Sequence, residues 1–349
     1  MAEYGKSNDR LKEITDRLEQ GIQDLFNSER YAAYLKTMSK FYNYSFNNTL
    51  LIALQRPNAT LVAGYNTWQD NFKRNVRRGE RGIKILAPCP IKRQVEMEKI
   101  DPVTQRPAIG PDGKPGTETM EVTIPAFKVA TVFDVSQTEG EPLPALGIDE
   151  LTGSVEQYPD FFEALKRGSP LPIDFEKIAS GAKGYCNFAE QHIAIQEGMG
   201  EVQTVKTAIH EITHARLHDI HREKEKDIPP EQRKDRNTRE VEAESVAYAV
   251  CQHYGIETSD YSFGYIAGWS NGRETKELKA SLELIRSTAA GLITDIDDNF
   301  RELVQTRAQG TSELTYAEAR DNKKPSVTER LKAQLPREKK SIRKSAMER

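Results

Sequence analysis

Two histidines and a glutamate occur at a spacing that can hold a metal ion and activate water. His210, Glu211 and His214 belong to the sequence H-E-I-T-H, an H-E-x-x-H motif inside a segment of helical periodicity. Residues four apart share one helix face, so both imidazoles can meet one zinc ion at about 2.0–2.1 Å. Glu211 occupies an adjoining position, from which it can reach a metal-bound water. The motif therefore predicts a zinc site with Glu211 as the general base of a hydrolysis.

A third protein ligand is expected, because catalytic zinc sites combine three protein ligands with one open position. His218 lies about 12 Å along the helix axis from His210, at 1.5 Å per residue, so we expect it on the surface or behind the ligands. The later segment R-E-V-E-A-E-S-V-A-Y offers Glu240, Glu242 and Glu244 instead. We favour Glu244, since the small and apolar residues beside it suit a helix packed against the motif helix. Glu240 and Glu242 are more typical of a solvated face, and the choice stays open.

The elements that must position these residues are mainly helices. Apolar periodicity predicts helices over about 11–26, 31–42, 46–56, 161–169, 202–221, 239–254 and 274–303. We expect Asn47 or Asn48 to cap the third helix and Gly255 to end the sixth. β-Branched runs predict strands in 82–94 and 119–135, joined by a loop rich in proline and glycine, and a hairpin in 184–198. The first half of the chain is therefore predicted to be α+β.

The chain of 349 residues is long for one hydrophobic core, which favours two domains. The polar segment 137–147 contains glycine and proline and is typical of a connector. We therefore predict a first domain over 1–145, a second over 146–300, and a charged tail over 301–349. From Asp321 onward the tail carries ten Lys and Arg against four Asp and Glu and no aromatic residue, so we expect disorder there.

Basic residues gather in one short segment of the first half. Residues 73–93 contain eight Lys and Arg and a single acid, Glu80, although the whole chain has a net charge of −3. Such a cluster is the electrostatic pattern of a polyanion site, and nearby aromatic residues can stack on bases. Each aromatic residue taken alone is more typical of a core position. The predicted contacts to single-stranded nucleic acid are Lys73, Arg74, Arg77, Arg78, Arg81 and Lys84, with Tyr65 and Trp68 as stacking platforms.

Composition and the terminal sequences narrow the class of protein. The first ten residues lack the apolar region of a signal peptide, and no apolar run is long enough to cross a bilayer. The three cysteines, Cys89, Cys186 and Cys251, are far apart and form no C-x-x-C motif, so we expect neither a disulfide framework nor a zinc ribbon. We therefore predict a cytoplasmic protein with no membrane partner.

The motif segment also carries a family resemblance. KTAIHEITHARLH, followed by EVEAESVAYAVCQHYGIETSDYSFGYIAGW, resembles the metallopeptidase-like domain of ArdC-type antirestriction proteins, a relative of the ImmA/IrrE zinc peptidases. The resemblance implies that His210, His214 and Glu244 bind zinc and that Glu211 is the catalytic base. The ImmA/IrrE pattern E-x-E-A also fits Glu240 to Ala243 and nominates Glu242 as the ligand. The resemblance therefore leaves the third ligand open.

The first half resembles the same family. NNTLLIALQRPNATLVAGYNTWQDNFKRNVRRGERGIKILAPCP is similar to the N-terminal single-stranded-DNA-binding domain of ArdC-type proteins, and the similarity covers about residues 10–140. The resemblance implies a mobile-element protein that binds incoming single-stranded DNA and shields it from restriction. It also implies a mainly helical, zincin-like second domain with a small sheet.

Two functions therefore compete. In the first, the protein binds single-stranded DNA and hydrolyses peptide bonds of a protein substrate, which segment 192–198 could hold as an edge strand. In the second, it is a non-catalytic DNA-binding and protective protein with a structural or vestigial zinc site. Three protein ligands with an open position favour the first function, and a closed site of four ligands favours the second.

Overall fold

The structure is a computed structural model that describes residues 2–100, 106, 116–143, 158–219, 233–256, 261 and 263–321. For residues 2–8 and 308–321 it describes the helical backbone alone. Contacts between Cα atoms divide the chain into two compact units, Met1–Asn299 and Phe300–Arg349. All the predicted site residues lie in the first of these units.

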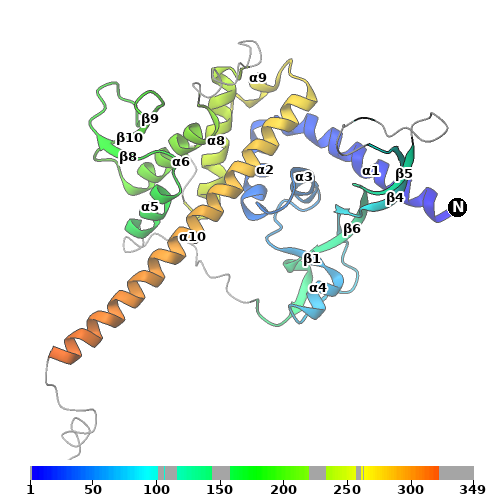
Figure 1. The fold of residues 1–349 in the computed structure, drawn as a ribbon, viewed down its shortest axis with the longest axis horizontal. Helices are drawn as coiled ribbons and strands as arrows, with labels where there is room; N and C mark the ends of the chain where they lie inside the picture. Colours follow the sequence, from blue (N-terminus) through cyan, green and yellow to red (C-terminus); the bar gives the residue numbers. More distant parts are fainter. Residues whose placement is uncertain are drawn as a thin grey trace, which may run out of the picture. The chain divides into compact units, whose positions relative to one another are not determined.

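Three helices open the chain, as predicted: α1 (Ala2–Leu25), α2 (Ser28–Lys40) and α3 (Phe46–Gln55) (Figure 1). The cap of α3 differs from the prediction of Asn47 or Asn48, because the Ser45 hydroxyl accepts the N–H of Asn48. The Asn48 side chain has another partner. Its amide donates to the carbonyl of Leu86 at 2.9 Å and accepts the N–H of Leu86 at 2.8 Å. Asn48 therefore joins α3 to a strand.

Short antiparallel strands and one helix follow. The three-stranded sheet has the order β1-β6-β3, and β2 pairs with β7 and β4 with β5. The bounds are β1 (Val62–Gly64), α4 (Tyr65–Asp70), β2 (Arg74–Val76), β3 (Ile83–Pro88), β4 (Ile91–Glu98), β5 (Thr117–Ile124), β6 (Phe127–Asp134) and β7 (Thr138–Gly140), with a short 3₁₀ helix at Val135–Gln137.

Each of the two predicted strand segments contains two strands. Segment 82–94 divides into β3 and the start of β4, and segment 119–135 divides into β5 and β6. The divisions fall at Pro88, Pro90 and Pro125, since proline has no N–H to donate to a strand ladder. The predicted loop between the segments falls mostly on 101–115, which, apart from Arg106, lies outside the described residues.

The predicted connector also contains regular structure. Strand β7 lies within 137–147 and pairs with β2, with Arg74 opposite Gly140. Gly140 has φ 137°, and a Cβ there would lie 2.5 Å from the carbonyl oxygen of Lys73, so the pairing requires glycine. The domain boundary predicted near residue 145 lies outside the described residues and stays a prediction.

A small core holds the first sheet against α3. Its side chains come from α3, the sheet and the loops between them, and Trp68 of α4 is fully buried beside it. The carboxylate of Asp134, at the end of β6, accepts the backbone N–H groups of Thr60 and Ser136 at 2.8 and 2.9 Å. The buried core residues are Phe41, Ile52, Ala59, Val62, Ile83, Ile85 and Val132.

The second half is mainly helical and has one small sheet, as predicted. The sheet has the order β8-β10-β9, with β10 parallel to β8 and antiparallel to β9, so the predicted hairpin in 184–198 is confirmed. Gly255 has φ 67° after α8, as expected for the glycine that ends a helix. The bounds are α5 (Tyr158–Arg167), β8 (Ile173–Glu176), β9 (Gly184–Asn187), β10 (His192–Gln196), α6 (Glu201–Leu217), α8 (Arg236–His253), α9 (Ile266–Ser270) and α10 (Thr275–Asp321).

Helix α2 packs against α8 and so connects the beginning of the chain to the second half. The Tyr31 hydroxyl lies 2.8 Å from the Ser245 hydroxyl inside this contact. The Tyr31 ring also meets the Phe263 ring edge-on, with 5.1 Å between centroids. The position of α8 therefore depends on residues from the first forty of the chain.

These elements confirm the α+β fold class, with strands concentrated in the first half and helices in the second. Helix α10 continues to Asp321, so the first part of the predicted charged tail, 301–321, is helical. The disorder expected after Asp321 concerns residues 322–349, which lie outside the described residues. The periodic segment 274–303 extends through Val304 and Thr306 without a proline or glycine until Gly310, so nothing in the sequence ends the helix there. None of the described helices is both long and apolar enough to span a membrane.

Candidate metal site and candidate nucleic-acid groove

Helix α6 places His210 and His214 side by side. The helix begins after Gly200 and runs to Leu217, so both histidines lie in its second half. Their Nε2 atoms are 3.0 Å apart, which is the arrangement predicted from the four-residue spacing. Both side chains are partly buried.

A carboxylate from α8 joins the two histidines. The Oε2 atom of Glu240 lies 3.5 Å from Nε2 of His210 and 3.6 Å from Nε2 of His214. Within the part of the chain that the structure describes, these three side chains form the one group of histidine, cysteine and carboxylate residues able to hold a metal ion. The structure therefore brings Glu240, rather than Glu244 or Glu242, to the histidines.

The three donor atoms fit a small divalent cation. Ligands about 2.0–2.1 Å from a tetrahedral zinc ion are about 3.3 Å from one another, close to the three separations in this triangle. Two imidazoles and one carboxylate are also a donor set of catalytic zinc sites, in which the fourth position stays open to water or substrate. The chemistry and the spacing of the donors therefore both suit such an ion.

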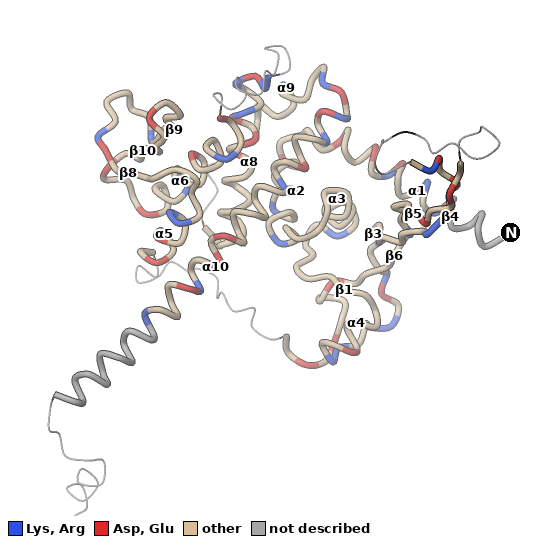
Figure 2. Tube along the Cα trace, in the orientation of Figure 1, with Lys and Arg blue, Asp and Glu red and all other residues tan. Residues whose placement is uncertain are grey.

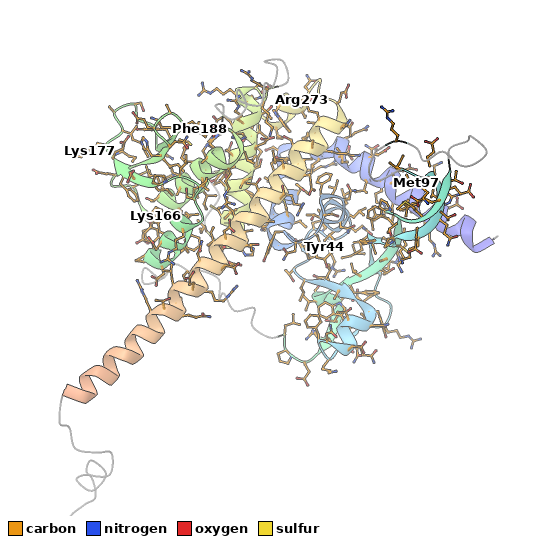
Figure 3. The ribbon with its side chains drawn as sticks, in the orientation of Figure 1. Tyr44, Met97, Lys166, Lys177, Phe188 and Arg273 are labelled. Carbon is orange, nitrogen blue, oxygen red and sulfur yellow. The ribbon has the colours of Figure 1, made fainter. Side chains whose placement is uncertain are left out.

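Hydrogen bonds fix the first turn of α8, close to Glu240. The side chain of Asp235 caps the helix by accepting the N–H of Thr238 at 2.6 Å. Arg273, labelled in Figure 3, donates to the other Asp235 oxygen at 2.6 Å from the segment before α10. Contacts from His210 and His214 hold the pKa of Glu240 far below its usual range, so its carboxylate is ionised. Glu240 is therefore a charged, positioned donor.

The favoured third ligand, Glu244, has another partner. Its carboxylate accepts a short hydrogen bond from the Tyr265 hydroxyl, and burial raises its pKa. Glu240 and Glu244 are one turn apart on the same face of α8, so the sequence did not distinguish them. The crossing of α8 over α6 determines which of the two reaches the histidines, and it selects Glu240.

Glu211 faces a cavity of about 410 Å³ beside the histidines. Gly184, at the start of β9, forms part of the wall, where a Cβ would lie 3.2 Å from Cγ of Glu211 and 2.6 Å from Cγ2 of Thr207. The glycine therefore lets β9 approach α6 closely. Burial raises the pKa of Glu211, which makes its carboxylate a better proton acceptor than an exposed one. The cavity is lined by Lys183, Gly184, Gln203, Lys206, Thr207, His210, Glu211, Glu244 and Tyr261.

The strand next to this cavity is not the predicted one. Segment 192–198, expected as an edge strand, supplies β10, which lies between β8 and β9. The edge strand is β9, because the hairpin folds back outside β10. Its Cys186 is unsuited to be a nucleophile, since burial raises the pKa of its thiol to about 12. The side chains near β9 that can take part in a reaction are therefore Glu211 and the three metal donors.

His218 and Glu242 are fully buried behind the donors rather than on the surface. His218 is 1% exposed and Glu242 is 0% exposed. Burial lowers the pKa of His218 and outweighs the opposite effect of its contact with Glu242. For Glu242, burial favours a higher pKa, but contacts with His218, Lys234 and Ser281 outweigh it and the net shift is downward. His218 therefore tends to be neutral and Glu242 ionised.

The basic cluster of the first half divides into two groups. Arg74 donates from Nε to the Thr138 hydroxyl at 2.8 Å and from Nη2 to the Thr138 carbonyl at 3.1 Å, and these hydrogen bonds connect β2 to β7. Arg77 donates to the carboxylate of Glu80 at 3.0 Å and to the carbonyl of Ser136 at 2.5 Å. Arg74 is half-buried, and Arg77 is exposed, as are Lys73, Arg78, Arg81 and Lys84. The guanidinium groups of Arg74 and Arg77 therefore contribute to the fold through these hydrogen bonds.

The two predicted stacking platforms also differ. Trp68 is 0% exposed, and its indole N–H donates to the carbonyl of Phe133 at 2.8 Å, so it is a core residue and the prediction is wrong. The helical turn of α4 points the indole at the sheet, a direction that composition does not reveal. Tyr65 is 53% exposed at the start of the same helix and presents a ring to solvent.

A larger basic groove lies between α1 and the sheet. It has a volume of about 1040 Å³, and five Lys and Arg line it against the single acid Glu13. Arg81 and Lys84 come from the predicted cluster, whereas Arg10, Arg17 and Lys128 were not predicted. Figure 2 shows basic and acidic residues scattered over many elements of the described chain, so charge runs alone do not reveal this groove. The seven-residue spacing of Arg10 and Arg17, which places both on one face of α1, is the signal that could have found them.

Comparison with known proteins agrees with the first half of this description. Residues 7–133 match the family model of the N-terminal domain of anti-restriction factor ArdC. An uncharacterized protein of Bacillus anthracis is 30% identical over 322 residues, or 85% of this chain and 53% of that protein. The chain thus spans about half the length of this curated relative.

Two crystal structures of the antirestriction ArdC protein from the R388 plasmid are also similar. The metal-free structure is 20% identical with a TM-score of 0.45, and the match covers 74% of this chain and 86% of that one. The Mn(II)-bound structure is 19% identical with a TM-score of 0.46, and the match covers 83% and 97%.

Fold and site together define an α+β protein with a candidate metal site in its helical half. Residues 7–133 match the model of the ArdC N-terminal domain, which agrees with the ArdC-type resemblance predicted for the first half of the chain. The metallopeptidase-like part of that resemblance rests on the residues of α6 and α8, because the matched range ends before them.

Proposed function

We propose that the protein hydrolyses peptide bonds at a zinc ion held by His210, His214 and Glu240. The observation that carries the proposal is the triangle of donor atoms on α6 and α8, beside a cavity that also contains Glu211. Three protein donors, one of which, His210, lines the cavity together with Glu211, favour a catalytic site over a closed structural site of four ligands. The alternative, a vestigial or structural zinc site in a purely protective protein, has less support from this geometry.

The proposed reaction assigns separate roles to the metal site, to Glu211 and to strand β9. A divalent ion held by His210, His214 and Glu240 would supply a Lewis acid and would make a nearby water more acidic. Glu211 accepts the proton of the attacking water on its carboxylate and returns it to the leaving amine. The edge strand β9 can pair with an extended peptide, because one side of its backbone faces away from β10. A protein substrate in an extended conformation fits this arrangement.

We propose further that the first half binds single-stranded DNA in the groove between α1 and the sheet. The support is the set of five Lys and Arg along one groove and the match of residues 7–133 to the model of the ArdC N-terminal domain. Phosphate neutralisation by such side chains needs no base sequence. The exposed ring of Tyr65 adds a surface for stacking on a base. Binding of this kind accounts for an antirestriction role, since covered DNA is inaccessible to a nuclease.

Replacement of Glu211 by Gln tests the hydrolytic function. We expect the Glu211→Gln protein to keep one zinc per chain and its melting temperature, and to lose hydrolysis of a mixed library of fluorogenic peptides. Glu201→Gln is the matched control, because Glu201 is an exposed glutamate on the same helix. Equal hydrolysis by the wild type and Glu211→Gln excludes Glu211 as base. A wild type that holds zinc but cleaves no peptide supports the non-catalytic alternative.

Titration of the full chain with labelled oligonucleotides tests the DNA-binding function. We expect single-stranded DNA of mixed sequence to bind with an affinity that falls steeply with salt, as for any contact made to phosphates. A matched RNA oligonucleotide and a matched duplex define the preferred nucleic acid. Binding that does not change between low and high salt contradicts the groove as the site.

A further inference from the structure

A chain of buried polar groups leads from the metal site to α10. Nδ1 of His214 lies 2.9 Å from Nδ1 of His218, and Nε2 of His218 lies 2.9 Å from Oε2 of Glu242. Lys234 donates to both carboxylate oxygens of Glu242, at 2.9 and 2.6 Å. The Ser281 hydroxyl of α10 donates a short hydrogen bond to Oε1. The carboxylate is therefore held from three sides in a fully buried position.

The direction of each hydrogen bond follows from the chemistry of the groups. Nε2 of His214 faces the other donors and must carry a lone pair to bind a cation. Its proton is then on Nδ1, which donates to Nδ1 of His218. His218 accepts there and carries its own proton on Nε2, which donates to Glu242. An ionised carboxylate only accepts hydrogen bonds, so the chain of donors ends consistently at Glu242.

We propose that His218 and Glu242 are positioning residues that hold His214 in the Nδ1–H tautomer, with Nε2 ready to bind the metal. Metal-binding histidines usually donate their second N–H directly to a carboxylate, a carbonyl or water. In this protein an imidazole stands between the ligand and the carboxylate. The proposal rests on the proposed function only in taking His214 as a metal ligand, and it assigns Glu242 to the support of the site rather than to the metal.

The position of His218 on α6 explains why it can serve this purpose. His218 is the C-cap residue, with φ −123° and ψ 26°, and its backbone N–H donates to the His214 carbonyl at 2.8 Å. It leaves the helix at this point, with its ring between His214 and α8. His210, His214 and His218 therefore share a four-residue spacing but have different tasks. The first two face the metal position, and the third faces Glu242.

The test compares two replacements of His218 in the full chain. The His218→Gln side chain keeps a carbonyl oxygen to accept from His214 and an amide to donate to Glu242. The His218→Leu side chain fills space but does neither. We expect the zinc Kd, measured by chelator competition, to rise about 10–100-fold in His218→Leu and clearly less in His218→Gln. Ser245→Ala, which removes a buried hydrogen bond of α8 outside this chain of groups, is the matched control and leaves the Kd unchanged.

A merely structural role predicts a different pattern, in which zinc affinity follows the melting temperature of each variant. A wild-type Kd in folded His218→Leu overturns the proposal, and so does an equal loss of zinc affinity in His218→Leu and Ser245→Ala of equal stability. Failure of the wild type to bind zinc overturns the proposed function instead, so the two results are distinguishable.

The wild-type protein provides a test that needs no variant. Long-range ¹⁵N–¹H spectra of the zinc-bound protein show which ring nitrogen of each histidine carries the proton. We expect Nδ1–H for His214 and Nε2–H for His218. The opposite tautomer at either residue overturns the proposal, even where a variant of His218 does not fold.

Discussion

The metal site takes two of its three donors from one helix, whereas the basic groove takes its cations from α1, the segment before β3, β3 itself and β6. In the metal site, helical geometry converts a sequence spacing directly into a distance between side chains. In the groove, residues more than a hundred positions apart lie along one surface, as Arg10 and Lys128 do. A local pattern therefore identifies a site well when one element builds it, and incompletely when several elements do.

Replacement of both histidines of α6 tests the metal site most directly. We expect the double variant His210→Ala, His214→Ala to lose stoichiometric zinc completely, because two of three protein donors vanish. Elemental analysis of the purified protein gives the metal content per chain. His192→Ala, a partly buried histidine of β10, is the matched control and keeps the metal. Retention of one zinc in the double variant contradicts the site.

The third donor, Glu240, comes from α8, so its replacement tests the contribution of that helix to metal binding. We expect Glu240→Ala to raise the zinc Kd at least about 100-fold, above the range that supporting residues account for. Glu244→Ala, one turn further along, changes the Kd far less, because its carboxylate binds Tyr265. Chelator competition on both variants gives the ranking. The reverse order assigns Glu244 as the ligand and Glu240 to the solvated face.

Charge reversal in the groove tests its assembly from several elements. We expect the triple variant Arg10→Glu, Arg17→Glu, Lys128→Glu to lower affinity for single-stranded DNA about 50-fold at 0.15 M salt. Three lost phosphate contacts also reduce the slope of log K against log salt by about 2.

A matched control separates groove contacts from net charge. Three exposed lysines of the second half, Lys166, Lys177 and Lys276, can be reversed together to change the net charge equally (Figure 3 labels the first two). We expect this control to bind almost as well as the wild type. Equal loss in both triple variants means that overall charge, rather than the groove, attracts the DNA.

The smallest expected effect distinguishes two arginines of one sequence cluster. We expect Arg74→Ala to lower the free energy of unfolding by about 1–2 kcal/mol, since a charged donor loses its contacts with β7. Arg81→Ala leaves stability unchanged and weakens DNA binding, because Arg81 is exposed in the groove. Urea denaturation and DNA titration of both variants give the two values. Identical behaviour of the two arginines contradicts the division of the cluster.

Much of the fold follows from periodicity, because amphipathic helices and a hairpin carry their signal in neighbouring residues. The divided strands were missed, since Pro88, Pro90 and Pro125 lie inside runs of strand-forming residues. Trp68 was assigned to the surface, because an aromatic residue beside a charge cluster suits either stacking or burial. The burial of Trp68 depends on contacts with residues far away in the sequence, such as Phe133, so neighbouring residues do not reveal it.

The residues alone were enough to predict the H-E-x-x-H helix, the pairing of His210 with His214 and the role open to Glu211, because all three depend on positions within about one turn of one helix. The residues of the first half also carry its resemblance to the ArdC N-terminal domain. The packing of the helices was needed to show that Glu240 rather than Glu244 meets the histidines, and that Glu242 lies behind them. The physical reason is that the crossing of α6, α8 and α10 sets these distances, and a crossing depends on the packing of the whole core.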